Sequence, residues 1–282
     1  MTTDDITIVI NTFNSDEKIF SCLDSIDSKI KIEVIENSNN IEFKTRIEKK
    51  YQNVKCTLAG INLGYAKGNN LGILKVKSKF ALILNPDTTL EINAINNFLI
   101  SAKIKPNFGI IAPAIQEAKD LQKNKYINQN QLIEVDNVKG FAMFFNLQQF
   151  RNIGFFDENF FIYFEEIDLC KRLKNDSKKI YLDPKIIINH IGGSSHNKSI
   201  NFEMELSRNW HWMWSTFYYH KKYYGFVRAL LKVSKKLLSA LIKVLFYTLI
   251  FNTNKKKIYY QRVSGLLNSI IGKKSWYRPN VF

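Results

Sequence analysis

The sequence predicts an α/β fold, in which a mostly parallel sheet is flanked by helices and followed by an amphipathic helical tail. Short β-branched runs alternate with segments of helical periodicity before the tail, and this alternation is typical of βαβ units. The run Ala81 to Leu84 is apolar without polar alternation, as in a strand buried on both faces. Residues 226–251 combine basic residues with a continuous apolar side. We therefore expect one domain over residues 1–225 and the tail over residues 226–282.

Each expected element has its own signal along the chain. Residues 6–10 and 31–35 are β-branched runs that predict strands. Between them, apolar residues recur at three- and four-residue intervals, so we expect a helix over residues 16–26 that Asn14 or Ser15 caps. Similar signals predict further strands at residues 54–58, 80–84, 109–112 and 139–146, helices ending near residues 50, 77 and 102, and a helix opening at Glu165. Residues 115–138 are polar and poorly periodic, which predicts a loop.

The excess of positive charge lies in the C-terminal part of the chain, from Leu206 onward. The formal net charge is +16, but from Leu206 onward there are 15 Lys and Arg residues and no acid, so 26 basic residues face 25 acidic ones in the first 205 residues. The nearly neutral body offers no basic groove, and we expect no nucleic-acid partner. Cys22, Cys56 and Cys170 are scattered and odd in number, which indicates a reducing compartment and no zinc site. The chain opens without the pattern of a signal peptide, so we expect a cytoplasmic protein.

One acid follows the buried strand directly. Pro86 has no N–H group and disfavours a helical Asn85, so the strand must end there and Asp87 projects from a fixed turn. The carboxyl edge of an open α/β sheet is where ligands bind. Asp87 therefore fits a ligand of a divalent metal that holds phosphates, and it equally fits an acid that starts the next helix at Thr88 or Thr89.

A loop rich in glycine and asparagine, residues 62–72, opens a helix. Glycine permits positive φ and close backbone approach, and a helix N-terminus favours anions, so a phosphate or nucleotide could dock there. The spacing matches neither a Walker loop nor a dinucleotide fingerprint. A purely structural turn is the other interpretation.

Three acids open the helix that carries Leu169, Cys170 and Leu173. Glu165, Glu166 and Asp168 could simply complement the helix dipole. Glu166, however, lies in register with the apolar side, while Glu165 and Asp168 share the next face. A partly desolvated carboxylate beside other carboxylates has a raised pKa, as a general base working near neutral pH requires.

His190 closes the apolar run 186–188 and precedes the flexible segment 192–196. A histidine at the end of a strand can be a metal ligand, a proton carrier or a satisfied surface residue. The sequence alone leaves all three interpretations open.

Taken in order, these segments resemble glycosyltransferase family 2, the inverting enzymes with the GT-A (Rossmann-like) fold, and within it the rhamnosyltransferase-like branch. The resemblance covers residues 6 to about 225. It rests on seven weak motifs in the family's order: residues 8–14, 34–38, 62–72, 84–88, 139–140 with 154–158, 163–172, and His190 with the Gly-Gly-Ser that follows two residues later.

The resemblance implies a donor site and a metal. Positions that line the nucleotide and sugar pocket are matched by Asn14, Glu36, Asn62, Gly64 and Asn70. Asp87 matches the last acid of the metal-binding Asp-x-Asp motif, whose first acid is Asn85 in this chain, and His190 matches a histidine that completes the metal site. One carboxylate with an imidazole suits Mn²⁺ somewhat better than Mg²⁺.

The resemblance also implies a mechanism. Glu166 matches the usual Asp of the family's Glu-Asp pair, the catalytic base, with Glu165 as the alternative and Asp168 beside them. The donor is a nucleoside-diphosphate sugar, with rhamnose suggested by the branch, and the acceptor is a lipid-linked glycan of cell-surface polysaccharide synthesis. One displacement with inversion needs no second carboxylate as a nucleophile.

The tail helix predicted over residues 226–251 carries basic residues on one face and Leu, Ile, Val and Phe on the other. Its basic residues, and fewer than the ~20 continuous apolar residues of a span, argue against a transmembrane helix. We expect it to lie on the anionic inner face of the cell membrane as a peripheral anchor. A helix packed within the protein is the alternative.

Two other functions fit parts of the sequence. A sugar nucleotidyltransferase would share nucleotide binding, but it should carry a basic, glycine-rich loop after the first strand, and residues 11–16 have none. A basic protein that binds nucleic acid or membranes on a catalytically impaired GT-A scaffold would explain the tail. The apolar side of the tail is too continuous for a surface that binds nucleic acid alone.

Overall fold

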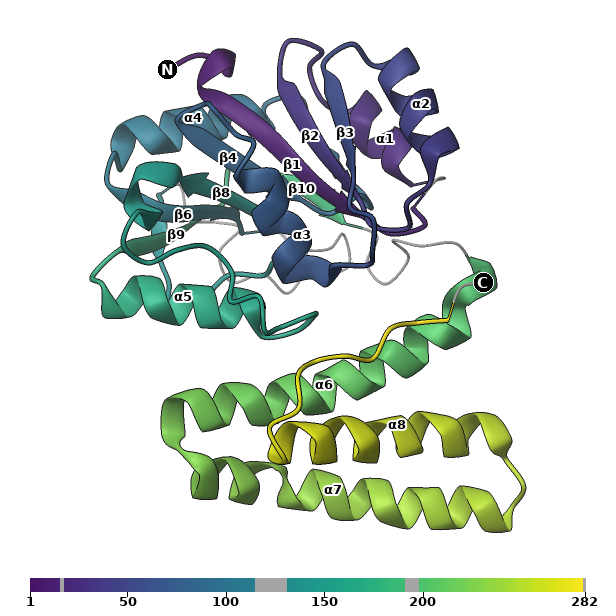
Figure 1. Ribbon diagram of the computed structural model, residues 1–282. Coiled ribbons are helices and arrows are strands. Elements are labelled where there is room, and N and C mark those ends of the chain that lie inside the picture. The colour runs from purple at the N-terminus through teal and green to yellow at the C-terminus, as the bar shows by residue number, and fades with distance from the viewer. Residues whose placement is uncertain (16–17, 115–130, 191–197, 281–282) are drawn as a thin grey trace. The chain divides into compact units, whose positions relative to one another are not determined.

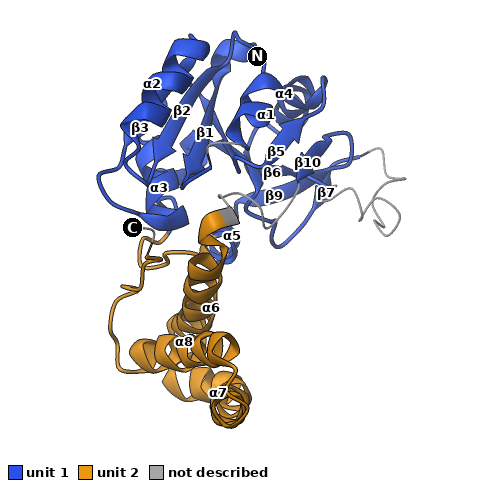
Figure 2. Ribbon diagram, turned by 90° about the vertical axis from the view of Figure 1, so that its right-hand side faces the viewer, with its two compact units in different colours: residues 1–156, 166–197 blue, residues 157–165, 198–282 orange. Residues whose placement is uncertain are grey.

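The computed structural model describes residues 1–15, 18–114, 131–190 and 198–280. The chain forms two compact units, coloured separately in Figure 2: unit 1 comprises residues 1–156 and 166–197, and unit 2 comprises residues 157–165 and 198–282. The predicted helix start at Asp16, most of the predicted loop 115–138 and the segment 192–196 lie outside the described residues.

Unit 1 is built on an eight-stranded sheet with the order β3-β2-β1-β4-β8-β6-β9-β7. Its strands are β1 (Ile6–Thr12), β2 (Lys31–Glu36), β3 (Val54–Leu58), β4 (Phe80–Leu84), β6 (Phe108–Pro113), β7 (Ile133–Glu134), β8 (Ala142–Asn146) and β9 (Lys179–Asp183). A second, two-stranded sheet pairs β5 (Thr88–Leu90) antiparallel with β10 (Ile188–His190). The predicted α/β fold with a mostly parallel sheet is confirmed.

β4 is central, as its apolar sequence predicts, and all five of its residues are buried. It runs parallel to β1, with Ile6 opposite Phe80 and Ile10 opposite Leu84. On its other side it pairs with β8, which runs antiparallel to both β4 and β6. β4 thus has one parallel and one antiparallel neighbour, and its apolar sequence does not indicate this because apolar character reports burial and not strand direction.

Helices cover both faces of the large sheet (Figure 1). They are α1 (Ile19–Asp24), α2 (Ile41–Lys50), α3 (Gly64–Ile73), α4 (Ala94–Ile104) and α5 (Glu165–Asn175), with short 3₁₀ helices at Thr3–Asp5, Leu147–Phe150 and Lys198–Ile200 elsewhere in the chain. Helices α1, α2 and α4 share one core with the side chains of Ile6, Ile8 and Ile10. On the opposite face α3 lies very close to β1, since a Cβ added at Gly72 would lie 2.3 Å from Val9 Cγ1.

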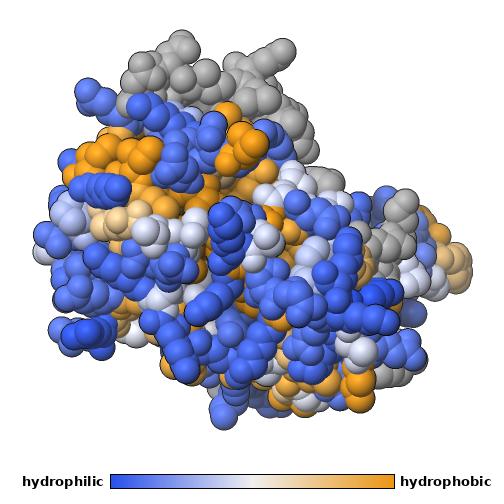
Figure 3. Space-filling model, turned by 90° about the horizontal axis from the view of Figure 1, so that it is seen from above, coloured by the Kyte–Doolittle hydropathy of each residue, from blue (hydrophilic) through white to orange (hydrophobic). Residues whose placement is uncertain are grey.

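Viewed from the side on which β1 begins, the molecule presents mostly hydrophilic side chains, with apolar patches between them (Figure 3). The continuous apolar strands lie beneath this surface, and β1 is buried at six of its seven positions. Apart from Asn11, the residues of β1 are thus buried within unit 1.

Unit 2 is a three-helix arrangement of α6 (Asn201–Tyr224), α7 (Phe226–Leu249) and α8 (Thr253–Ile270), shown at the bottom of Figure 1. Gly225, with φ 83°, separates α6 from α7. Unit 2 includes α6, whereas the predicted boundary after residue 225 would assign that helix to the first domain. α8 approaches α6 closely, because a Cβ at Gly265 would lie 2.2 Å from the carbonyl oxygen of Trp210. Among the described helices, none is long and apolar enough to cross a bilayer.

The apolar residues of α7 differ in burial. Small ones face inward and are at most 2% exposed: Ala229, Val233 and Ala240. Leu230 and Leu237 are partly buried and pack against this inward side. Large ones form an exposed set that we call the α7 stripe: Val227, Leu231, Leu238, Leu241, Ile242, Leu245 and Leu249. Leu231 is 70% exposed and Leu249 is 77% exposed. Only part of the predicted continuous apolar face of the tail is therefore used in packing.

Candidate active site

The candidate site lies at the carboxyl edge of the large sheet, where strand order reverses between β1 and β4. Ligands of open α/β sheets bind at such a point. Asn11 lies near this edge, one residue before the end of β1, and Asn14 follows in a left-handed conformation with φ 49°. Asn85 and Asp87 follow β4 at the same edge. The topology thus brings the predicted residues Asn14, Asn85 and Asp87 to one edge of the sheet.

Asp87 and His190 come together through the small sheet. β5 begins at Thr88, and in its pairing with β10 Thr88 lies opposite His190. This register places Asp87 Oδ1 3.4 Å from His190 Nε2. The imidazole stacks on Phe141, with ring centroids 4.8 Å apart and planes 7° from parallel. Backbone pairing of β5 with β10 and stacking on Phe141 therefore hold the His190 side chain beside Asp87, which is distant from it in the sequence.

The surroundings of the Asp87 carboxylate are those expected of a side chain that coordinates a cation. It is 3% exposed, and within the described residues its Oδ1 is buried and accepts no hydrogen bond. An unsatisfied buried carboxylate oxygen is costly unless a charge or donor meets it. Carboxylate with imidazole is a donor set that suits Mn²⁺. In the described part of the chain no group of three or more metal-ligating side chains occurs. The assignment of Asp87 and His190 as metal ligands stays a prediction.

Asn85 shapes the turn that carries Asp87. Its carbonyl oxygen accepts a hydrogen bond from the Thr88 hydroxyl at 2.7 Å, and its N–H group donates to the carbonyl oxygen of Phe141 at 2.9 Å. The partly exposed side chain of Asn85 stands where the resemblance implies the first acid of an Asp-x-Asp motif. Its neutral amide lowers the negative charge available to a metal.

Gly140, which shortly precedes β8, lies close to side chains of α3 and α5. Tyr65 of α3 donates its hydroxyl hydrogen bond to the carbonyl oxygen of Gly140. A Cβ at Gly140 would lie 3.2 Å from the Tyr65 hydroxyl oxygen and 3.7 Å from Glu166 Cβ. Larger residues at this position would crowd both side chains. Sequence reasoning missed Tyr65, although it stands inside the glycine-rich loop and is the aromatic residue there.

Glu166 lies in the first turn of α5 in the predicted register, and Leu169, Cys170 and Leu173 on its apolar side are fully buried. Burial raises the pKa of the Glu166 carboxyl, while backbone N–H groups of Glu166 and Ile167 oppose the rise. The pKa is therefore shifted toward the range in which a general base works. Its assignment as the base stays a prediction.

Glu165 is the first residue of α5 and is 5% exposed. The two residues before it, Tyr163 and Phe164, both have φ 72°, a left-handed conformation that is unusual for large side chains. The chain thus enters α5 through a strained turn, and such strain clusters at functional sites. Nothing in this geometry removes Glu165 as the alternative base.

Asp168 has a structural task. It is fully buried, and its Oδ2 accepts a hydrogen bond from Arg172 Nε at 2.8 Å. Arg172 Nη1 donates to the carbonyl oxygen of Ile153 at 2.8 Å, and Nη2 donates to that of Phe155. Asp168 therefore orients a guanidinium that fastens the loop after β8 to α5. This contact accounts for its place among the acids of the first turns, and a direct part in catalysis stays a prediction.

The carboxylate of Glu36, at the end of β2, accepts hydrogen bonds from the turn that follows the strand. One carboxylate oxygen accepts hydrogen bonds from the N–H group and hydroxyl of Ser38, and the other accepts one from the N–H group of Asn40 at 2.7 Å. The next residue, Asn37, links this turn to β1 and α3, because its amide bonds Asn11 and accepts from the N–H group of Leu63. Sequence reasoning did not find the Asn11–Asn37 link.

The glycine-rich loop has structural tasks as well. Asn62 Oδ1 accepts from the N–H group of Gly64 at 3.1 Å, and Gly64 has φ 75°. Gly68 faces Asn11 so closely that a Cβ would lie 2.4 Å from its Oδ1. Asn70 holds the backbone of Phe156 at both polar groups, at 2.9 and 3.0 Å. These contacts support the structural interpretation, and nucleotide binding by Asn62, Gly64 and Asn70 stays a prediction.

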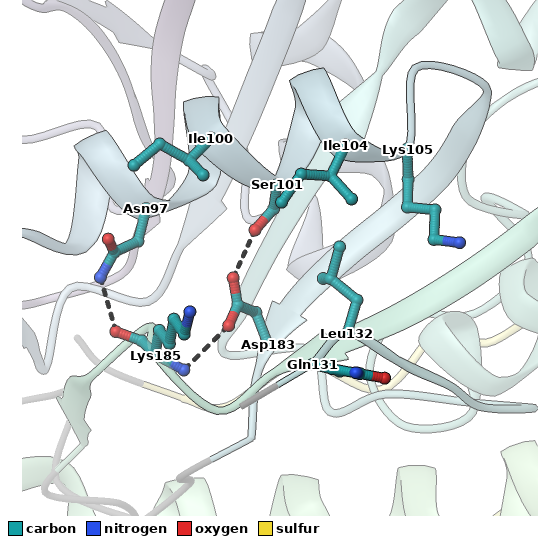
Figure 4. Close-up of a pocket in the computed structure, with 9 residues that line it drawn as sticks. All are labelled: Asn97, Ile100, Ser101, Ile104, Lys105, Gln131, Leu132, Asp183 and Lys185. Atoms are coloured by element: carbon teal, nitrogen blue, oxygen red, sulfur yellow. Dashed lines mark hydrogen bonds between the residues drawn. The ribbon is translucent and has the colours of Figure 1, made fainter. Parts of the chain in front are cut away.

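A pocket of about 400 Å³ lies elsewhere in unit 1, between α4 and the connection from β9 to β10 (Figure 4). Asp183 there accepts a hydrogen bond from the Ser101 hydroxyl and another from the N–H group of Lys185 at 2.8 Å. Asn97 donates to the carbonyl oxygen of Lys185 at 2.6 Å. These bonds fix the segment leading to β10, and none of the predicted site residues lines the pocket.

The fold matches that of GT-A glycosyltransferases. A mannosyltransferase from Pyrobaculum calidifontis, solved in complex with GDP-Man and Mn²⁺, matches 96% of this chain and 88% of its own, with a TM-score of 0.61 and 11% identity. S. aureus TarS matches 98% of this chain and 94% of its own, with a TM-score of 0.56 and 12% identity, and it has also been solved with UDP-GlcNAc. At these identities the likeness shows the fold.

Sequence similarity points to the same class of enzyme. Over 200 residues the chain is 28% identical to the low-salt glycan biosynthesis hexosyltransferase Agl10 of Haloferax volcanii. The match covers 63% of this chain and 64% of the relative, so the chain spans less than two thirds of the relative's length. No protein-family model matches the chain. The predicted glycosyltransferase homology is confirmed at this coarser level.

Proposed function

We propose that the protein is a glycosyltransferase that moves a hexosyl group from a nucleoside-diphosphate sugar to a glycan acceptor. The observation that carries this proposal is the pair Asp87 and His190, 3.4 Å apart at the strand-order reversal of a GT-A fold. Similarity to a hexosyltransferase of glycan biosynthesis supports it. Family 2, inversion at the anomeric carbon and a rhamnosyl donor are the finer parts of the proposal, and they rest on the motif resemblance.

In the proposed reaction, separate residues of unit 1 bind the metal and deprotonate the acceptor. Asp87 and His190 would hold a divalent cation, which supplies Lewis-acid stabilisation of the diphosphate leaving group. Glu166 takes the proton from the acceptor hydroxyl as that oxygen attacks the anomeric carbon from the face opposite the diphosphate. The raised pKa of the Glu166 carboxyl makes it a stronger base than an exposed glutamate. A single displacement of this kind inverts the configuration and requires no glycosyl-enzyme intermediate.

We also propose that unit 2 binds the anionic inner face of the cell membrane, where a lipid-linked acceptor would be available. The α7 stripe leaves Leu231, Leu238 and Leu245 between 61% and 70% exposed, although smaller residues of the same helix are buried. Basic residues of α7 flank the stripe: Arg228, Lys232, Lys235, Lys236 and Lys243. Exposed aliphatic groups beside cations complement the acyl region and the headgroups of an anionic leaflet.

The experiment that tests the proposed activity distinguishes it from that of a nucleotidyltransferase. The full chain is incubated with a panel of nucleoside-diphosphate sugars, Mn²⁺ or Mg²⁺ and a membrane extract as a source of acceptor. Release of nucleoside diphosphate with incorporation of sugar into the lipid fraction is expected. Release of pyrophosphate from sugar phosphate and nucleoside triphosphate would favour the nucleotidyltransferase instead, and the absence of both reactions with every donor would contradict the proposal.

A further inference from the structure

Unit 2 contains a basic pocket of about 340 Å³ whose chemistry the proposed transfer reaction does not use. It is lined by Asn159, Trp214, Tyr218, Lys221, Lys222, Ser269, Gly272, Lys273 and Lys274. The lining includes four lysines and no acidic side chain. One wall is aromatic, because Trp214 stacks on Tyr218 with ring centroids 4.9 Å apart. The pocket therefore combines ammonium groups with a flat apolar surface.

The backbone around the pocket is fixed. Trp214 is 3% exposed, and its indole N–H group donates to the carbonyl oxygen of Lys273 at 3.0 Å. Ser269, which is 4% exposed, donates its hydroxyl to the carbonyl oxygen of Trp214 at 2.9 Å. Gly272, with φ 77°, ends α8 between these contacts. The turn that carries Lys273 and Lys274 is thus attached to a buried part of α6.

The charges of the pocket are poorly compensated within the chain. Lys222 pairs with Asp157 at 2.8 Å, and the Tyr218 hydroxyl donates to the same carboxylate at 3.2 Å. No ion pair recorded among the described residues includes Lys221, Lys273 or Lys274. Like charges gathered in one concave site repel each other, and an anion relieves that repulsion. Ammonium groups bind phosphate oxygens through short, charge-assisted hydrogen bonds.

Apolar residues lie next to these lysines. Lys221 Nζ is 5.8 Å from the ring centroid of Phe226, where α7 begins, and Phe226 is 44% exposed. Val227, the first residue of the α7 stripe, is 69% exposed. Ile271, directly before the pocket residue Gly272, is 65% exposed. A free phosphate would use the lysines but leave these apolar groups in water, whereas a lipid phosphate would use both.

We propose that this pocket binds the phosphate of a membrane lipid whose hydrocarbon chain lies along the start of the α7 stripe. The inference rests on the proposed membrane contact of unit 2 and is independent of sugar transfer. Lys221, Lys273 and Lys274 contact the phosphate oxygens, and Trp214 with Tyr218 forms the wall against which the headgroup lies. The pocket then sets the depth and orientation of α7 at the bilayer surface.

The test uses a soluble short-chain lipid, so that general attraction to a charged bilayer does not contribute. Dihexanoyl phosphatidylglycerol, kept below its micelle concentration, is titrated into the full-length protein by calorimetry, with inorganic phosphate in a parallel titration. We expect one saturable lipid site, and weaker binding of inorganic phosphate. The double variant Lys273→Gln/Lys274→Gln should lose at least about tenfold in lipid affinity. If the double variant fails to fold, Lys221→Gln is used in its place. Lys221 lies outside the turn that carries Lys273 and Lys274, and its substitution should also weaken lipid binding.

The matched control is Lys255→Gln/Lys256→Gln, which removes the same charge from exposed positions at the other end of α8. It should bind the lipid as the wild-type protein does. Absence of a saturable site, equal losses in both double variants, or equal affinity for inorganic phosphate and the lipid would overturn the proposal. Nucleoside-diphosphate release from the donor is measured in parallel and should be unchanged in Lys273→Gln/Lys274→Gln. Lipid binding without any donor turnover in the wild type would contradict the proposed transferase function alone.

Discussion

Asp87 Oδ1 lies 3.4 Å from His190 Nε2, although β6, β8, β9 and α5 intervene between the two residues in the chain. The contact exists because β5 leaves the turn after Asp87 and is met by β10 in antiparallel register. Phe141 stacks on the imidazole and fixes its plane. The small two-stranded sheet therefore places His190 beside Asp87 at the carboxyl edge of the large sheet.

The first prediction concerns Asp87. Asp87→Ala removes the carboxylate of the pair and should reduce nucleoside-diphosphate binding in Mn²⁺ to the affinity seen without metal. Calorimetric titration of nucleoside diphosphate with and without Mn²⁺ measures this. The exposed acid variant Asp24→Asn serves as the control and should retain the metal effect. An Asp87→Ala protein whose nucleotide affinity still rises with Mn²⁺ would show that the metal is held elsewhere.

The second prediction concerns the base. Glu166→Gln should lower kcat by a factor on the order of 10² or more, while donor affinity is retained. Burial raises the pKa of Glu166, so in the wild type the active carboxylate is lost as the pH falls through that raised pKa. The acidic limb of the pH–kcat profile should therefore lie above the ordinary glutamate range and disappear in Glu166→Gln. If Glu165→Gln is inactive and Glu166→Gln turns over normally, Glu165 is the base.

The third prediction concerns the loop after β8. Asp168→Ala leaves the largely buried Arg172 guanidinium without its carboxylate, and breaking one side of a buried pair should cost about 3 kcal/mol of unfolding free energy. Urea unfolding of unit 1, followed by circular dichroism, measures the loss. Lys50→Ala breaks the exposed Lys50–Asp24 pair and should leave the unfolding free energy unchanged. Equal stability of Asp168→Ala and wild type would remove the structural role assigned to Asp168.

The fourth prediction concerns the α7 stripe. Leu238→Glu places a charge in the stripe, whereas Ser239→Glu places the same charge on the next residue, which is also exposed but faces the basic side. Both variants change the net charge equally, so any difference between them reports apolar contact with the bilayer. Flotation with anionic vesicles should show a much greater loss for Leu238→Glu. Identical flotation of the two variants, or no flotation of the wild type, would indicate that α7 does not insert.

Sequence reasoning predicted the elements whose residues are uniformly buried. β4 occurs at the predicted residues, because a continuous apolar run bounded by turns leaves little choice of structure. β3 also occurs at the predicted residues, although only Val54 and Cys56 of its side chains are buried. Sequence reasoning missed β5, β7 and β9, which carry polar residues such as Thr89, Glu134 and Lys179, and β7 lies within the predicted loop 115–138. A strand ending at His190 was expected, and β10 occurs there. Sequence reasoning also missed the direction of β8, since an apolar pattern does not encode which neighbour a strand pairs with.

For the candidate site, local sequence singled out residues but did not predict their contacts. The turn at Asp87 follows from Pro86 alone, whereas its approach to His190 requires the β5–β10 pairing. Asn70 and Asp168 stand within motifs on which the family resemblance rests, and their side chains bond Phe156 and Arg172. Phe156 is distant from Asn70 in the chain, and no local pattern predicts this contact. Arg172, by contrast, follows Asp168 on the same helix. In α7, likewise, hydropathy does not separate the small inward residues from the large exposed ones.

The measurement that tests the proposed donor site most directly is anomalous diffraction from crystals of the full chain grown with Mn²⁺ and a nucleoside diphosphate. The account predicts one manganese peak within coordination distance of Asp87 and His190, with the diphosphate beside it at the edge between β1 and β4. A manganese peak at other residues, or a nucleotide bound away from this edge, would contradict it.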